Sequence, residues 1–163
     1  MIEKSKSNMR SESSRVVSFD LHDTILVFKF GRKLSEIKLL RAILYFLSNF
    51  RLFIFVYTAF CERSEQIIEL MRQLKAEGNK VIILTAAYKK SAKIIYHFLR
   101  KNNITSYDQV IFRKKLSQKQ GDYKIEEIIK NNISLHYDDD KTACSQINAQ
   151  GRACVAVNPW YNK

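Results

Sequence analysis

Short apolar runs rich in β-branched residues alternate with segments of helical spacing along most of the chain. Apolar residues that recur every three or four positions predict amphipathic helices, and continuous apolar runs bounded by polar residues predict buried strands. This alternation predicts an α/β domain with a mainly parallel sheet of about five strands and helices on both faces. The expected strands are 15–19, 81–84, 109–112, 133–137 and 153–157, and the expected helices are 64–77, 91–102, 122–130 and 142–149.

With 163 residues, the chain is long enough for one core and short for two. Residues 1–14 are polar and rich in serine, and we expect a disordered tail there. We expect residues 15–163 to form the domain, with a cap-like insert at about 25–61 after the first strand. Within the insert, helical spacing from Ile37 to Leu47 predicts one helix, whereas Leu52–Tyr57 is an apolar run of undecided type.

The chain is strongly basic, with 28 Lys and Arg against 16 Asp and Glu and a formal net charge of +12. This charge favours anionic partners such as nucleic acid, phosphorylated metabolites or an acidic membrane surface. A composition rich in Lys, Asn, Ile and Tyr is also typical of an AT-biased genome, so both explanations of the charge stay open.

The three cysteines, Cys61, Cys144 and Cys154, are widely spaced and form no paired motif that could hold zinc or act as a redox couple. We therefore expect buried thiols in a reducing compartment. The N-terminal segment lacks the order of basic, apolar and small residues that marks a signal peptide, which favours a cytoplasmic protein.

The apolar segment Leu39–Phe60 has roughly the length of a membrane-spanning helix, but it contains Arg41, Asn49 and Arg51. Arginines oppose the insertion of a span, most strongly if they lie near its centre. We expect no transmembrane segment here. A cap packed on the main domain is the first interpretation, and an oligomer contact or a membrane-surface contact of 39–60 is the second.

Polar residues stand where the expected strands end. Ligands of open parallel sheets bind at the carboxyl ends of the strands, and these ends carry Asp20, Thr85 and the pair Asp138–Asp139. A carboxylate can attack phosphorus, but a phosphate dianion repels it unless a cation lies between them. Because the available ligands are oxygens, without a cluster of His or Cys, the sequence predicts magnesium and phosphoryl transfer.

Four segments in this order resemble the four motifs of the haloacid dehalogenase-like (HAD) superfamily. Val16–Thr24 resembles the first motif, an apolar strand followed by Asp-x-Asp-x-Thr, and Val81–Thr85 resembles the second. Lys124 resembles the lysine of the third motif, and Leu135–Asp139 resembles the fourth. The resemblance implies a Rossmann-like core and a magnesium-dependent phosphohydrolase that acts on phosphate monoesters through an aspartyl-phosphate intermediate.

For the phosphoryl group, the resemblance implies that Asp20 is the nucleophile and that Lys124 offsets negative charge on the intermediate. Thr85 would bind the transferring phosphoryl group together with Ala86. Simpler explanations remain open at this stage. Thr85 could be a plain turn residue, and Lys119 is a rival for the role of Lys124.

For the metal, the resemblance implies that Asp20 and Asp139, with Asp138 beside it, hold magnesium. The backbone carbonyl of His22 would be a further ligand. The alternative for the two adjacent aspartates is that they only form an N-cap for the helix expected at Thr142, which is a common use of Asp.

His22 stands where phosphatases of this family have a second Asp, which acts as general acid and base. Histidine has an unperturbed pKa of about 6.5 and could take this role. It could instead mark altered chemistry, or a slow or inactive enzyme that keeps phosphate binding. Because strand residues alternate in direction, we expect Asp23 to point away from the site. We expect His97 and His136 to be structural.

The short insert leaves the expected site open, which suits a bulky substrate such as a nucleic-acid end or a phosphoprotein. Phe28, Lys29, Phe30, Arg32 and Lys33 would lie near its mouth.

The order of elements after Asp122 resembles polynucleotide 3′-phosphatase-like and RNA-repair-associated HAD domains. Ala143 departs from many HAD relatives, which have another Asp there. The alternative function is a catalytically impaired module that binds a phosphorylated or protein partner. The oligomeric state is not predicted.

Overall fold

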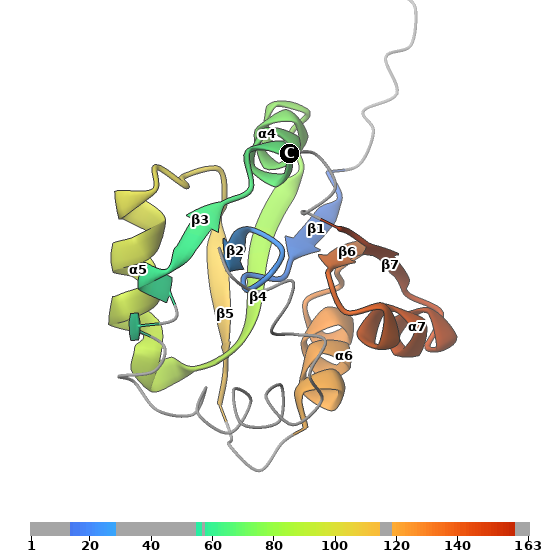
Figure 1. Cartoon of the computed structure of the whole chain (residues 1–163). Coiled ribbons are helices and arrows are strands. Elements are labelled where there is room, and N and C mark those ends of the chain that lie inside the picture. Colours follow the sequence, from blue (N-terminus) through green and yellow to red (C-terminus); the bar gives the residue numbers. More distant parts are fainter. Residues whose placement is uncertain (1–13, 29–54, 57, 115–118, 159–163) are drawn as a thin grey trace, which may run out of the picture.

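The computed structural model describes residues 14–28, 55–56, 58–114 and 119–158. Five strands form one sheet in the order β5-β4-β1-β6-β7, and each neighbouring pair is parallel. The predicted fold class is confirmed (Figure 1). The strands are β1 (Val16–Phe19), β4 (Lys80–Tyr88), β5 (Gln109–Arg113), β6 (Leu135–Asp138) and β7 (Ala153–Ala156).

Helices cover both faces of the sheet, and each face has its own apolar core (Figure 1). On one face, α4 (Glu65–Ala76) and α5 (Ala92–Lys101), which follows the short helix η1 (Lys89–Ser91), pack through Ile68 and Ile95 against β1 and β4. On the other face, α6 (Gln120–Lys130) and α7 (Lys141–Ala149) bury Tyr123 and Ile147. The two-sided arrangement explains why β4 is apolar without alternation: its successive residues enter opposite cores.

The ends of two helices follow from local chemistry. Helix α4 ends shortly before Gly78, whose φ of 83° is a left-handed conformation that glycine adopts at low cost, as predicted from the sequence. Helix α7 is capped by Asp140, whose carboxylate accepts hydrogen bonds from the backbone N–H groups of Thr142 (2.8 Å) and Ala143 (3.3 Å). The N-cap is therefore Asp140, and neither Asp138 nor Asp139 is needed for it.

The insert after β1 begins and ends in a two-stranded antiparallel ribbon. Strand β2 (Leu26–Phe28) pairs with β3 (Cys61–Arg63), with Val27 opposite Glu62. The ribbon joins the two ends of the insert next to the carboxyl end of β1. The predictions for 1–14, for the helix at Ile37–Leu47 and for residues 29–33 at the site mouth fall almost entirely outside the described residues.

Most bounds agree with the sequence prediction to within two residues, and two of the differences bear on the site. Strand β4 continues to Tyr88, so that Thr85 lies inside the strand rather than after it, and the pairing with β5 shifts register between Thr85 and Tyr88. Helix α6 begins at Gln120, two residues before the predicted start. The continuous apolar run ends at Leu84, but pairing with β5 continues the strand to Tyr88, and a local pattern shows neither this pairing nor the polar first turn of α6.

The expectation of three buried thiols is wrong for two of the cysteines. Cys144 in α7 and Cys154 in β7 form a disulfide, with their Cα atoms 5.0 Å apart. They are ten positions apart in the sequence, and the turn after α7 returns the chain alongside the helix. Cys61 is a buried thiol, as expected. Within the described part of the chain, no helix is both long and apolar enough to cross a membrane.

Candidate functional site

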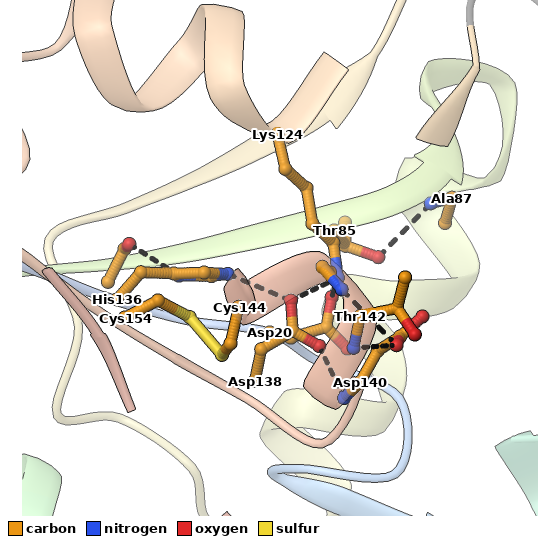
Figure 2. A network of polar contacts seen from close by, with 12 residues as sticks. Asp20, Thr85, Ala87, Lys124, His136, Asp138, Asp140, Thr142, Cys144 and Cys154 are labelled. Atoms are coloured by element: carbon orange, nitrogen blue, oxygen red, sulfur yellow. Dashed lines mark hydrogen bonds and ion pairs between the residues drawn. A yellow bond between two sulfur atoms is a disulfide. The ribbon is translucent and has the colours of Figure 1, made fainter. Parts of the chain in front are cut away.

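Two aspartates meet at the carboxyl edge of the sheet, where β1 and β6 lie side by side (Figure 2). Asp20 directly follows β1, and its backbone N–H donates to the carbonyl of Tyr137 at 2.8 Å. Asp138 is the last residue of β6. The parallel pairing of Phe19 with Tyr137 continues through this hydrogen bond, so both carboxylates project from the same edge.

Lys124 enters this edge from α6 and forms ion pairs with both carboxylates (Figure 2). Its Nζ lies 2.6 Å from Oδ2 of Asp138 and 2.9 Å from Oδ1 of Asp20, and its side chain is only 2 % exposed. Lys119, the rival in the sequence, is an exposed residue at the start of α6. The structure therefore brings Lys124 together with Asp20, and Lys119 has no such contact.

Asp138 has two further partners behind the lysine. Its Oδ1 accepts from the backbone N–H of Asp140 at 3.1 Å, and its Oδ2 lies 3.1 Å from Nε2 of His136. Nδ1 of His136 lies in turn 2.8 Å from Oγ of Ser18. The sequence predicts a structural role for His136 and no role for Ser18. A signal was available: each is a polar residue two positions before an aspartate, on the same strand face.

Thr85 lies on β4, the strand on the other side of β1. Phe19 pairs with Ile83, so Thr85 lies two positions beyond the partner of the residue that precedes Asp20. Its side chain is buried, and its Oγ1 accepts a hydrogen bond from the backbone N–H of Ala87 at 3.1 Å. The intervening Ala86 is partly exposed. Thr85 is thus a buried strand residue rather than a plain turn residue.

Burial and mutual charge shift the pKa values of this cluster. Burial raises the pKa of Asp20, and the ammonium of Lys124 offsets only part of that rise. Burial acts in the same direction on Asp138, but its hydrogen bond to His136 and the charge of Lys124 bring its pKa well below the usual value. Burial would lower the pKa of Lys124, yet the two carboxylates raise it, so the ammonium is retained.

Asp139 completes a group of three carboxylates with Asp20 and Asp138, whose candidate ligand oxygens all lie within 4.8 Å of one another. Burial raises the pKa of Asp139 to about 8, and the negative charge of Asp20 adds to this effect. The ammonium of Lys124 offsets only part of this rise. Oxygen donors in this arrangement fit magnesium, which favours carboxylate ligands and neutralises them.

No protein-family model and no curated protein sequence matches the chain, but solved structures match its fold. A chain of the Pnkp1/Rnl/Hen1 RNA repair complex superposes with a TM-score of 0.66 at 18% identity over 89% of this chain. A haloacid dehalogenase-like hydrolase from Streptococcus pneumoniae superposes with a TM-score of 0.58 at 14% identity, covering 88% of this chain and 84% of that one. The chain has the haloacid dehalogenase (HAD) fold.

Other HAD structures extend the comparison. A HAD enzyme from Bacteroides thetaiotaomicron in complex with magnesium and inorganic phosphate superposes with a TM-score of 0.60 at 11% identity, over 91% of this chain and 96% of that one. The chain spans 42% and 47% of two matched chains from the RNA repair complex. Structural neighbours of the HAD core thus include hydrolases, one of them with magnesium and phosphate bound.

His22 lies in the tight turn that follows the first strand of the HAD core, where its backbone forms a bridge with Leu26. Burial lowers the pKa of His22 to about 4, and the nearby charge of Lys124 adds to the shift. At neutral pH the imidazole is therefore neutral and is suited to accept a proton rather than to donate one.

Asp23 occupies the next position with a φ of 60°, a left-handed conformation that Asp tolerates better than most residues. We expected its side chain to point away from the site. Its charge is nevertheless close enough to raise the pKa of Asp139 and that of Asp20. The strand alternation on which the expectation depended ends at Phe19, and the turn redirects the residues that follow.

Proposed function

We propose that the chain is a magnesium-dependent phosphohydrolase that cleaves phosphate monoesters through an aspartyl-phosphate intermediate on Asp20. The observation that carries this proposal is the convergence of Asp20, Asp138, Asp139 and Lys124 at one edge of a HAD core. Phosphoryl transfer requires a positioned nucleophile and positive charge around the transferring group, and this cluster supplies the nucleophile and a buried ammonium.

In the proposed reaction, one carboxylate oxygen of Asp20 attacks phosphorus, and the bond to the leaving oxygen breaks with its electron pair going to that oxygen, which takes a proton from water. Water then attacks the phosphorus of the intermediate, which releases phosphate and restores Asp20. Lys124, whose Nζ lies 2.9 Å from Oδ1 of Asp20, favours the ionised form of this nucleophile and would offset charge on the phosphoryl oxygens. Thr85 and the backbone at Ala86 would bind the phosphoryl group from the neighbouring strand.

His22 is the proposed general base in this scheme. Because the imidazole is neutral at pH 7, it can accept the proton of the water that hydrolyses the intermediate. With a pKa of about 4, His22 holds no proton at neutral pH that it could donate to the leaving group.

The residues that would hold the ion are Asp20, Asp139 and the backbone carbonyl of His22, with Asp138 beside them. Magnesium, when bound, would reduce the repulsion between Asp20 and the substrate phosphate. Both oxygens of Asp138 already accept hydrogen bonds or ion pairs from the protein. For this reason we assign Asp139, rather than Asp138, as the second carboxylate ligand.

A phosphorylated nucleic-acid end is the proposed substrate class. Tyr88 at the end of β4 pairs with Arg113 at the end of β5, so the exposed Lys89, Lys90 and Lys114 leave adjacent strands at the edge that carries Asp20. Lys90 also lies over the ring of Tyr88, with its Nζ 5.8 Å from the ring centroid. Lysines with an aromatic ring suit a nucleic-acid backbone and its bases. The matched RNA repair complex supports the same class by analogy.

Turnover of an aryl phosphate with and without magnesium tests the chemical proposal. We expect magnesium-dependent release of phosphate by the wild type and at least a 1000-fold loss, on the order expected for a removed nucleophile, in Asp20→Asn. Asp140→Asn is the matched control, because Asn also caps helices. Turnover that persists in Asp20→Asn would contradict the proposal.

The substrate class needs a separate comparison of an oligonucleotide 3′-phosphate with a phosphopeptide. We expect Lys114→Ala to raise KM for the oligonucleotide and to leave aryl phosphate turnover unchanged. Lys80→Ala, an exposed lysine at the opposite end of β4, is the control. A preference for the phosphopeptide, or equal effects of the two substitutions, would reject the nucleic-acid end.

A catalytically impaired module that binds a phosphorylated partner is the second candidate. The replacement of the family's acidic residue by His22 favours it, because a neutral imidazole does not protonate a leaving group. Magnesium and phosphate binding by a wild type that shows no turnover would support this candidate against the enzyme.

A further inference from the structure

A polar line of buried side chains extends from the candidate site into the sheet (Figure 2). Ser18, His136 and Asp138 are fully buried, and the contacts Ser18 Oγ–His136 Nδ1 (2.8 Å) and His136 Nε2–Asp138 Oδ2 (3.1 Å) connect them. Burying three polar side chains in a sheet costs free energy unless each is hydrogen-bonded. The line ends on Lys124, which the proposed chemistry uses.

The chemistry of the three side chains determines which atom donates and which accepts in the Ser18–His136 and His136–Asp138 hydrogen bonds. Oδ2 of Asp138 already receives the ammonium of Lys124 at 2.6 Å and acts as an acceptor, so the approach of Nε2 of His136 to the same oxygen assigns the proton to Nε2. In the neutral imidazole the other ring nitrogen then has a free lone pair, and Nδ1 accepts from the hydroxyl of Ser18 at 2.8 Å. Ser18 thus selects one tautomer of His136, and that tautomer is the one Asp138 needs.

The register of the strands explains why these contacts form together. Ser18 and His136 are direct partners in the parallel pairing of β1 with β6, and Asp20 and Asp138 lie two residues farther along. Both polar pairs therefore face the same side of the sheet, toward α6. The contact of His136 with Oδ2 of Asp138 is made to the same oxygen that receives Lys124.

We propose that Ser18 and His136 are positioning residues that orient Asp138 toward Lys124, and so determine where the ammonium lies relative to Asp20. In this arrangement the adjacent aspartates have different tasks. Asp138 holds the lysine, whereas Asp139 is left for the ion. The proposal depends on the phosphohydrolase function for its kinetic consequence, but the hydrogen-bond pattern can be tested without it.

Two substitutions of His136 separate its two contacts. The amide nitrogen of Gln lies about as far from the backbone as Nε2 of His, so His136→Gln can still donate to Asp138 but loses the hydrogen bond with Ser18. The amide of Asn lies about as far from the backbone as Nδ1 of His, so His136→Asn can retain a contact with Ser18 but loses the hydrogen bond to Asp138. Residues that orient a catalytic group typically change activity by about 10- to 100-fold when removed.

Aryl phosphate kinetics of this pair form the first test. We expect kcat to fall about 10- to 100-fold in His136→Asn and much less in His136→Gln. KM and the magnesium concentration for half-maximal activity should stay unchanged in both. Equal losses of kcat in the two variants would mean that His136 only fills space, and a raised magnesium requirement would mean that it supports the ion instead.

The second test uses the wild type and needs neither activity nor a stable variant. We expect nitrogen NMR of labelled histidine to show a proton on Nε2 and a bare Nδ1 for His136, assigned by the signal lost in His136→Gln. In Ser18→Ala we expect part of the population to move to the other tautomer. A proton on Nδ1 in the wild type would overturn the proposal. Failure of turnover alone would reject the phosphohydrolase function and leave this result intact.

Discussion

At the scale of single residues, Lys124 lies between two carboxylates in a buried environment. Its Nζ is within 2.9 Å of Asp20 and 2.6 Å of Asp138. A buried ion pair adds little net stability compared with an apolar pair, but removing one partner leaves an uncompensated charge. The lysine is therefore needed by the fold as well as by the proposed chemistry.

We expect Lys124→Met, which keeps most of the side-chain volume, to lower the free energy of unfolding by about 3–5 kcal/mol at pH 7, measured by urea denaturation. The reason is that Asp20 and Asp138 would face each other without a cation. Lys119→Met, at an exposed position, should change stability by less than about 0.5 kcal/mol. Equal effects of the two substitutions would show that Lys124 does not balance the carboxylates.

His22 provides the second prediction at this scale. We expect His22→Ala to lower kcat for an aryl phosphate by about 100-fold or more, because water loses its general base. The first step needs no added proton when the leaving group is a weakly basic phenolate, so a burst of phenolate should precede slow turnover. The exposed His97→Ala is the control. A fall in kcat without a burst of phenolate would mean that His22 acts in the first step, the attack of Asp20 on phosphorus.

At the scale of elements, polar residues obtain their partners where strands and helices come into contact. Asp108 is an example outside the site. It lies where β4 and β5 begin, and it connects three elements. Its carboxylate accepts from Nζ of Lys75 in α4 at 2.6 Å and from the backbone N–H of Val81 in β4 at 2.8 Å, and it lies just before β5. A single side chain thus secures the start of two strands and the end of one helix.

This arrangement predicts how stability depends on pH. Burial would raise the pKa of Asp108, but the hydrogen bonds from Lys75 and Val81 lower it below the model-peptide value of 3.8. A carboxylate with a lowered folded-state pKa stabilises the protein above pH 3.8 and loses this contribution as the pH falls through the folded pKa. We expect Asp108→Asn to cost about 1 kcal/mol at neutral pH and nothing at strongly acidic pH.

Urea denaturation of Asp108→Asn, Lys75→Met and the double variant at several pH values measures this effect. The coupling energy between Asp108 and Lys75 should disappear together with the charge on Asp108. A coupling that does not change with pH would show that the contact is not ionic.

At the scale of the whole molecule, positive and negative charge are arranged unevenly around the carboxyl edge of the sheet. The acidic cluster lies at β1 and β6, whereas Lys89, Lys90 and Lys114 follow β4 and β5. The net charge of +12 therefore coexists with a local excess of negative charge, which a divalent cation can neutralise.

We expect saturating magnesium to raise the melting temperature. At a concentration of about 100 times Kd, the gain of roughly 2.7 kcal/mol corresponds to about 5–10 °C for a domain of this size. Asp139→Asn should abolish the rise and Asp140→Asn should preserve it, as measured by thermal unfolding with magnesium and with EDTA. A similar rise in both variants would exclude Asp139 as a ligand.

The sequence by itself determined the order of strands and helices, the parallel sheet and the positions of Asp20, Thr85, Lys124 and Asp138–Asp139 near strand ends or on α6. These features were predictable because they depend on local periodicity and on the rule that parallel strands end at one edge. The end of β4 and the start of α6 were less predictable, since β4 continues past its apolar run through pairing with β5 and α6 begins with polar residues.

Only the tertiary structure decided how the polar residues share their partners. Asp138, Asp139 and Asp140 are chemically identical in the sequence, yet one holds Lys124, one faces the other carboxylates and one caps α7. Ser18 meets His136 across 118 positions, and Cys144 meets Cys154 through the packing of α7 beside β7. Such contacts depend on strand register and helix packing, which are set by the whole core rather than by any local pattern.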